Sequence, residues 1–200
     1  GDVYKRQLIH LSFKDSLLLS FDDHSSDPQN YAYTLIHCNA DWTPSELMES
    51  EYLEGFYEEP ITDYQFSFNT IQNYVHYQTV IPSNNLKPTL SGNYLLIVFK
   101  ENQKDRPILS QRMMIIDEKV SVKGSVKRAT DLEQRNHQHE IDFSIYHDGY
   151  EIDNPFSEII PVITQNSRWD NAISGLQAVF VKNDEIVYDY EDENLFDGGN

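Results

Sequence analysis

The feature that most constrains the fold is a series of short strand-like runs separated by turn residues. The best of them, Asn93–Lys100 (NYLLIVFK), is almost continuously apolar, which predicts a strand buried on both faces. Tyr31–Cys38 alternates between two faces, as a strand does, with Tyr31, Tyr33, Leu35 and His37 on one side. After a polar turn through residues 101–106, Ile108–Ile116 is expected to pair back antiparallel to Asn93–Lys100. The pattern therefore favours an all-β fold.

The predicted strands form two groups. The first group is Leu8–Phe13, Leu17–Phe21, Tyr31–Cys38, Tyr64–Phe68, Val75–Ile81, Asn93–Lys100 and Ile108–Ile116, roughly the seven strands that an immunoglobulin-like sandwich needs. The second group is Val120–Val126, Ile141–Tyr146, Ile159–Ile163, Leu176–Val181 and Ile186–Tyr190. The sequence thus predicts two tandem immunoglobulin-like or fibronectin-III-like β-sandwich modules, at residues 8–118 and 119–200.

Both ends of the chain carry expectations of their own. The second module is expected to be truncated at its C-terminus, because five strands make an incomplete sandwich and Gly198-Gly199-Asn200 is a turn signal. Residues 1–7 have neither apolar content nor a pattern, so they are interpreted as an extraneous leader.

One short helix is expected between the third and fourth strands. Thr43 and Glu46 have the spacing of a capping box, in which the threonine hydroxyl and the glutamate carboxylate each bond the other residue's amide. Pro44 would occupy the first helical position, and Gly55 would end the helix. We expect a helix of two or three turns at most.

A second structural motif precedes the most buried strand. Gly92 permits a tight backbone there, and the Tyr94 hydroxyl two residues later can fold back onto the preceding corner. Such a tyrosine corner is a structural feature of sandwich folds. We therefore assign Gly92 and Tyr94 a structural role.

The composition narrows the class of partner. With 15 basic and 33 acidic side chains the net charge is −18, which repels nucleic acid and anionic lipid head groups. Cys38 is the only cysteine, so an intrachain disulfide is excluded. His37 is its neighbour, but adjacent strand residues point to opposite faces, which argues against a nucleophile–base pair. Cys38 is interpreted as a buried structural thiol.

Two groups of residues have the composition of metal ligands. His137 and His139 would share one face of a strand, but no third ligand at a useful spacing is evident. The acidic run from Asp184 to Glu193 lacks the glycine-punctuated spacing of a calcium loop. Both are interpreted as solvated faces, with ion binding left open. No phosphate loop, nucleophile elbow, paired-cysteine motif or HExxH occurs, so we predict no catalytic residues, no metal, no cofactor and no enzyme activity.

Two tryptophan-bearing loops have the composition of interface anchors. One contains Asp41 and Trp42, and the other contains Arg168, Trp169 and Asp170. With Tyr52, these residues are the candidate partner-binding set. In the alternative interpretation each indole caps the open end of a core, while Asp41 and Asp170 make hydrogen bonds within turns.

Four segments of the chain carry a family resemblance. They read YTLIHCNADWTPSELMESEYLEGF, DYQFSFNTIQNYVHY, LSGNYLL and QNSRWDNA, in that order along the chain. Together they resemble the plug protein of the type IX secretion system, a family found in Bacteroidetes. The family's proteins are longer, so the resemblance implies that this chain is an N-terminal portion.

The resemblance implies a role in protein transport. It implies a periplasmic accessory protein that is held at the outer membrane by protein–protein interaction, without inserting into the membrane itself. Its implied function is to occlude the periplasmic mouth of the outer-membrane translocon barrel. An alternative is a carbohydrate-binding or accessory sandwich module of a secreted glycan-degrading enzyme, in which Trp42, Tyr52 or Trp169 stacks on sugars. A hydrolase that uses Asp and Glu is a third hypothesis without a distinguishing motif.

Overall fold

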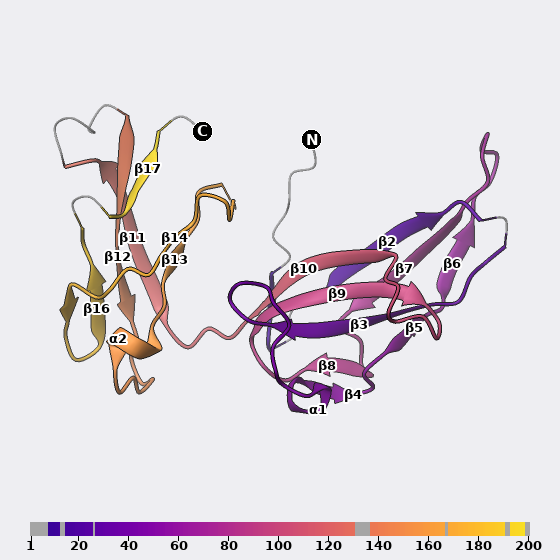
Figure 1. Ribbon diagram of the computed structural model, residues 1–200, viewed down its shortest axis with the longest axis horizontal. Coiled ribbons are helices and arrows are strands. Elements are labelled where there is room, and N and C mark those ends of the chain that lie inside the picture. The colour runs from indigo at the N-terminus through magenta and orange to yellow at the C-terminus, as the bar shows by residue number, and fades with distance from the viewer. Residues whose placement is uncertain are drawn as a thin grey trace. The chain divides into compact units, whose positions relative to one another are not determined.

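The structure is a computed structural model that describes residues 8–12, 15–25, 27–130, 137–166, 168–190 and 193–198. These residues form strands and loops with two helices of four residues each (Figure 1). The predicted all-β fold is confirmed. The described chain divides into two compact units, one ending at Asp117 and the other beginning at Glu118. The predicted leader, residues 1–7, lies outside the described residues, as do Gly199 and Asn200.

The first unit is built from two main sheets. The larger has the order β1 (Leu8–His10), β10 (Leu109–Ile116), β9 (Gly92–Lys100), β3 (Tyr31–Cys38) and β5 (Glu59–Ile61). The smaller has the order β2 (Leu17–Asp23), β7 (Val75–Ile81) and β6 (Asp63–Phe66). Only β1 and β10 pair in parallel among these strands. A further pair consists of β4 (Leu53–Gly55) and β8 (Leu86–Pro88).

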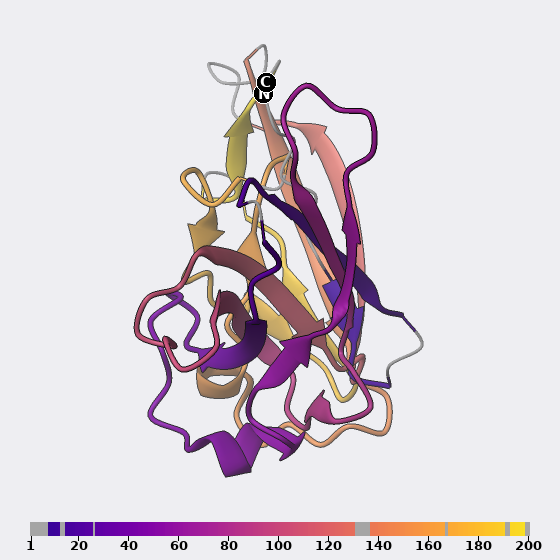
Figure 2. The same ribbon diagram turned by 90° about the vertical axis from the view of Figure 1, so that its right-hand side faces the viewer.

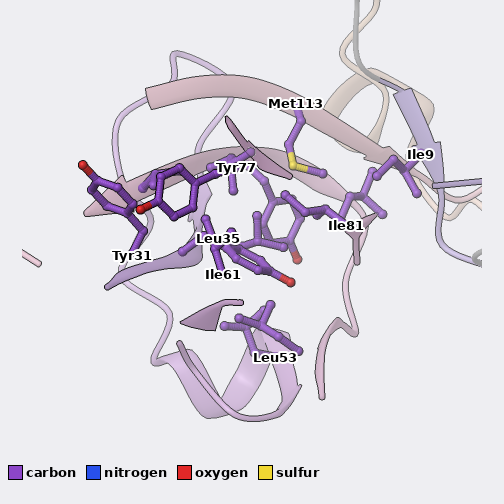
Figure 3. Packing of buried hydrophobic residues seen from close by; sticks show 14 of the residues in the cluster. Ile9, Tyr31, Leu35, Leu53, Ile61, Tyr77, Ile81 and Met113 are labelled. Atoms are coloured by element: carbon purple, nitrogen blue, oxygen red, sulfur yellow. The ribbon is translucent and has the colours of Figure 1, made fainter. Parts of the chain in front are cut away.

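The main hydrophobic core of this unit lies between the two sheets (Figure 3). It combines Tyr31 and Leu35 of β3 and Met113 of β10 with Tyr77 and Ile81 of β7, all of them buried. The Tyr77 ring meets the Tyr31 ring edge-on, with 4.9 Å between the centroids. Because side chains from both sheets share one buried cluster, the two layers form a sandwich.

Strand β9 is buried on both faces, as its apolar sequence predicts. Tyr94, Leu96 and Val98 belong to the core between the sheets, whereas Ile97 and Phe99 pack with other side chains on the opposite face. The predicted antiparallel pairing of β9 with β10 is also confirmed.

The expected capping box at Thr43 and Glu46 is wrong. Ser45 donates its backbone N–H to the His37 carbonyl oxygen over 2.9 Å, and Pro44 forms a β-bridge with Cys38. This pairing with the end of β3 holds the chain extended where the local pattern predicts a first helical turn. A backbone engaged with a strand cannot also begin a helix.

The helix, α1 (Glu49–Tyr52), begins further along and is one turn long. Its capping carboxylate belongs to Glu51, which accepts a hydrogen bond from the Met48 backbone N–H over 2.6 Å. Gly55 lies in β4 rather than at the helix end. Its φ of +94° favours glycine, and a Cβ there would lie 2.1 Å from the Asn85 carbonyl oxygen.

The second unit has one main sheet and a small second layer. The sheet has the order β11 (Ser121–Arg128), β12 (Gln138–Tyr146), β16 (Glu185–Tyr188) and β15 (Phe180–Val181), and β17 (Leu195–Asp197) pairs with the start of β12. The other elements are α2 (Pro155–Glu158), β13 (Val162–Ile163) and β14 (Ile173–Ser174). The predicted strands at 159–163 and 176–181 are therefore two residues long each, and α2 was not expected.

The core of the second unit is small and separate. Ile145, Ile186 and Tyr188 are buried in it, and the Phe143 ring stacks on the Tyr188 ring with centroids 4.6 Å apart. Every side chain of β11, in contrast, is exposed. In the described parts of both units, no helix has the length and apolar character that crossing a membrane requires.

Candidate interaction surfaces

The loop that carries Asp41 and Trp42 is a tight turn held by hydrogen bonds. Asp41 Oδ1 accepts from the Thr43 backbone N–H over 3.0 Å and from the Thr43 hydroxyl over 2.6 Å. These bonds lower the pKa of the exposed Asp41 carboxyl. Trp42 has a φ of +69°, and the Arg112 guanidinium carbon of β10 lies 4.9 Å from the centre of its ring. The indole is therefore held against a cation on β10 and does not belong to the core cluster.

Tyr52 is not available as an exposed anchor. Its side chain is buried, with its ring centroid 5.7 Å from that of His37 and 6.0 Å from that of Tyr94. The Tyr94 hydroxyl in turn donates to the Leu90 carbonyl oxygen over 2.8 Å, which is the contact of a tyrosine corner. The expectation of an exposed Tyr52 ring for a partner or a sugar is therefore wrong.

The second tryptophan loop is organised by an ion pair. Arg168 contacts Asp170 through two bonds, Nη2 to Oδ2 over 2.5 Å and Nε to Oδ1 over 3.1 Å. This pairing raises the pKa of Arg168 and lowers the pKa of Asp170. Trp169 lies between them in sequence and is partly exposed. Trp42 belongs to the first unit and Trp169 to the second.

The acidic residues of the second unit gather around a lysine. Lys127 Nζ lies 2.7 Å from Asp142 Oδ2, 3.2 Å from Glu140 Oε1 and 3.8 Å from Asp189 Oδ1. Oxygens of the three carboxylates lie within 4.8 Å of one another, as the ligands of a metal ion would. The Lys127 ammonium, however, already pairs with all three carboxylates. The arrangement therefore works as an internal ion pair between β11 and β12.

Glu140 is the buried member of this group. It is 1% exposed, and its Oε2 accepts from the Thr130 backbone N–H over 2.9 Å and the Thr130 hydroxyl over 2.7 Å. Burial raises the pKa of Glu140, but the hydrogen bonds from Thr130 and Lys127 outweigh it, so the net pKa is lowered. His137 and His139 join no group of three ligands among the described residues.

A further surface lies on the hairpin formed by β6 and β7. Tyr64, Phe66 and Phe68 are 44%, 62% and 87% exposed, and Ile71 in the connecting loop is fully exposed. We call these four residues the hairpin surface. Figures 1 and 2 both show the loop between β6 and β7 projecting beyond the rest of its sheet. The alternation of aromatic residues is visible in the sequence, but no partner role follows from it alone.

Strand pairing explains why these rings are exposed. Tyr64 pairs with Tyr77 and Phe66 pairs with Val75, so both side chains lie on the core-facing side of the smaller sheet. Strand β6 is the last strand of that sheet, so the core cluster does not extend over it. A sequence signal does exist, because residues 64–86 contain no Asp, Glu, Lys or Arg in a chain of net charge −18.

Comparison with known proteins shows which family the chain matches. Residues 2–117, which include the whole described part of the first unit, match the model of the type 9 secretion system plug protein, first domain. The chain belongs to this family. The resemblance seen in the sequence is therefore confirmed, and the protein is associated with type IX secretion.

One solved structure extends the likeness to the whole chain. It is a hypothetical protein from Parabacteroides merdae, 30% identical, with a TM-score of 0.88. The alignment covers 100% of this chain and 50% of that one, so this plug-family chain spans half the length of its relative. No curated protein matches the chain.

Proposed function

We propose that this protein is a non-enzymatic accessory protein of the type IX secretion system that plugs the periplasmic opening of the outer-membrane translocon barrel. The observation that carries the proposal is the family match over residues 2–117. The match supports a location in the periplasm, at the outer membrane, with the barrel as the partner.

The physical character of the first unit supports this role. A stopper must keep its shape when it seals an opening, and here two sheets are joined by interlocking aromatic rings of Phe21, Tyr31 and Tyr77. Burial raises the pKa of the Cys38 thiol, and the neighbouring His37 packs against Tyr94 on the other face of β3. The thiol is thus kept protonated and away from a base, which suits a structural residue.

The test combines binding with conductance. The native full-length protein and the translocon barrel would be co-purified, and single-channel conductance of the barrel would be recorded with and without the protein. We expect a stable complex and a loss of conductance when the protein is added. Absence of a complex together with unchanged conductance would overturn the proposal.

A further inference from the structure

We infer that β6 is a docking edge, to which an extended and uncharged segment of a partner protein adds as a further strand. The side chains of the hairpin surface would pack against this segment. The inference deepens the proposed function and rests on it for the identity of the partner, the translocon barrel.

The register of the hairpin shows which backbone groups are available. Ser67 donates its N–H to the Tyr74 carbonyl oxygen over 2.9 Å, so these two residues form a hydrogen-bonded pair. Bonded and non-bonded pairs alternate along an antiparallel ladder. The backbone groups of Tyr64 and Phe66 therefore point away from β7, toward the open edge. Among the described residues, β7 is the only strand that pairs with β6.

Among the described residues, the other outer strands of the three larger sheets carry features that discourage strand addition, whereas β6 carries a single charge at one end. Edges are usually protected by charges, by proline or by shortness. Proline protects β5, which contains Pro60. Charges protect β2, which ends in Asp22 and Asp23, and β11, which contains Lys123, Lys127 and Arg128. Shortness protects β1 and β15, which have three and two residues. In β6 the only charge is Asp63, its first residue. An unprotected edge beside exposed aromatic rings is the arrangement that binds an added strand.

Charge determines what the occupant must be. A charged side chain placed against Tyr64, Phe66 and Phe68 would be desolvated without a counter-charge, because residues 64–86 contain none. An acidic segment would also be repelled by the −18 net charge. The segment is therefore uncharged along Tyr64–Phe68 and basic where it passes Asp63.

The connecting loop is ordered in advance of binding. The Thr70 hydroxyl donates to the Gln72 carbonyl oxygen over 2.9 Å, and the Ser67 hydroxyl accepts from the Tyr74 backbone N–H over 2.9 Å. These bonds hold the loop that carries Phe68 and Ile71. A preformed loop loses less conformational entropy when its side chains become anchors.

The first experiment uses the native full-length protein and the barrel. Phe66→Lys places a charge on the edge, and Phe68→Ser removes an anchor; both side chains are exposed, so the fold should tolerate either change. Val80→Ser is the matched control, because Val80 lies in the same uncharged run, is 50% exposed and faces away from the core on β7. We expect the wild type and Val80→Ser to co-purify with the barrel, and Phe66→Lys to reduce recovery at least about tenfold.

The outcomes separate the two proposals. If the wild type and all three variants bind the barrel equally, the docking edge is wrong and the proposed function stands. If the wild type does not bind the barrel, the proposed function fails, and a second experiment decides the docking edge. That experiment measures binding of the peptide Thr-Val-Thr-Val-Thr-Val-Thr-Lys by the amide chemical shifts of Tyr64 and Phe66. We expect the peptide to bind the wild-type protein. Binding should be lost when alternate peptide amides are N-methylated or when Phe66 is changed to Lys. If the peptide does not bind the wild-type protein, the inference is overturned.

Two other occupants give distinct results. A dimer in solution that Phe66→Lys converts to a monomer would show that a second copy of the chain covers β6. Flotation with neutral phosphatidylcholine vesicles that Phe68→Ser abolishes would show that the loop contacts lipid. Either result would overturn the inference of a partner strand.

Discussion

Gly92 shows how a single residue shapes the start of β9. Its φ is +145°, and a Cβ there would lie 2.7 Å from His37 Nε2. We therefore expect Gly92→Ala to lower the free energy of unfolding by about 1–3 kcal/mol, through backbone strain and this close contact. Adding His37→Ala should recover only part of the loss, because the strain at φ remains. Urea denaturation measures both; a Gly92→Ala protein as stable as the wild type would contradict the prediction.

Lys127 gives a second prediction at the residue scale. Lys127→Met would leave the buried Glu140 carboxylate with Thr130 as its remaining hydrogen-bond donor. Breaking a buried ion pair costs about 3–5 kcal/mol, and we expect roughly 2 kcal/mol because the lysine side chain is half exposed. The matched control is Lys123→Met, on the same face of β11 but over the Tyr146 ring, with an expected loss below about 1 kcal/mol.

The pH dependence of this pair has a definite sign. The pKa of Glu140 is lowered in the folded protein, so its stabilising contribution is present above the ordinary glutamate pKa of 4.5 and is lost as the pH falls through the lowered value. The stability difference between wild type and Lys127→Met should therefore shrink as the pH is lowered below about 4.5. Denaturation curves at a series of pH values test this, and a gap that widens in acid would contradict it.

The residue scale also shows where sequence reasoning succeeds. The tyrosine corner could be predicted because its parts are local: Gly92 and Tyr94 are two residues apart, and the Tyr94 hydroxyl donates to the carbonyl oxygen of nearby Leu90. The capping box at Thr43 and Glu46 is an equally local pattern, but pairing of Ser45 with His37 competes with it. Local patterns fail where a nearby strand offers the backbone another partner.

At the element scale, β7 joins the two layers of the first unit through Tyr77, whose ring meets the Tyr31 ring of β3 edge-on with centroids 4.9 Å apart. Its ring stacks on Phe21 with centroids 5.2 Å apart, and its hydroxyl accepts from the Gln29 backbone N–H over 2.7 Å and donates to the Gln29 carbonyl oxygen over 3.0 Å. We expect Tyr77→Phe to cost about 1–2 kcal/mol for these hydrogen bonds and Tyr77→Ala about 3–5 kcal/mol for the added cavity. Chemical denaturation separates the two; equal losses would contradict the assignment of the ring as the main contributor.

Element length decides how much of the fold was predictable. Strands β3 and β7 have the predicted bounds, because seven or eight alternating residues give an unambiguous period. Strands β4, β5 and β8 were missed, since three residues carry no period and their pairing depends on tertiary partners. The hairpin surface could be predicted only in part. The sequence shows the alternation of Tyr64 and Phe66, but their exposure follows from the position of β6 at a sheet edge, which the sequence does not reveal.

At the scale of the whole molecule, charge is the dominant property. With a net charge of −18 on 200 residues, the excess acidic side chains repel one another, and this repulsion destabilises the compact state. Composition alone suggests only solubility and repulsion of other anions, and it was the family resemblance that connected the chain with type IX secretion. The uncharged run 64–86 stands out against this background because a partner can approach it without desolvating a charge.

Self-repulsion of this size predicts a salt dependence of stability. Raising sodium chloride from about 10 mM to about 150 mM shortens the screening length from about 30 Å to about 8 Å, so the melting temperature at pH 7 should rise. Near the sequence isoelectric point of about 4.5 the net charge vanishes, and the same salt change should then have little effect. Thermal melts monitored by circular dichroism at the two pH values measure both slopes. A melting temperature that falls with salt at pH 7 would show instead that ion pairs such as those of Lys127 outweigh the repulsion, because screening weakens attraction and repulsion alike.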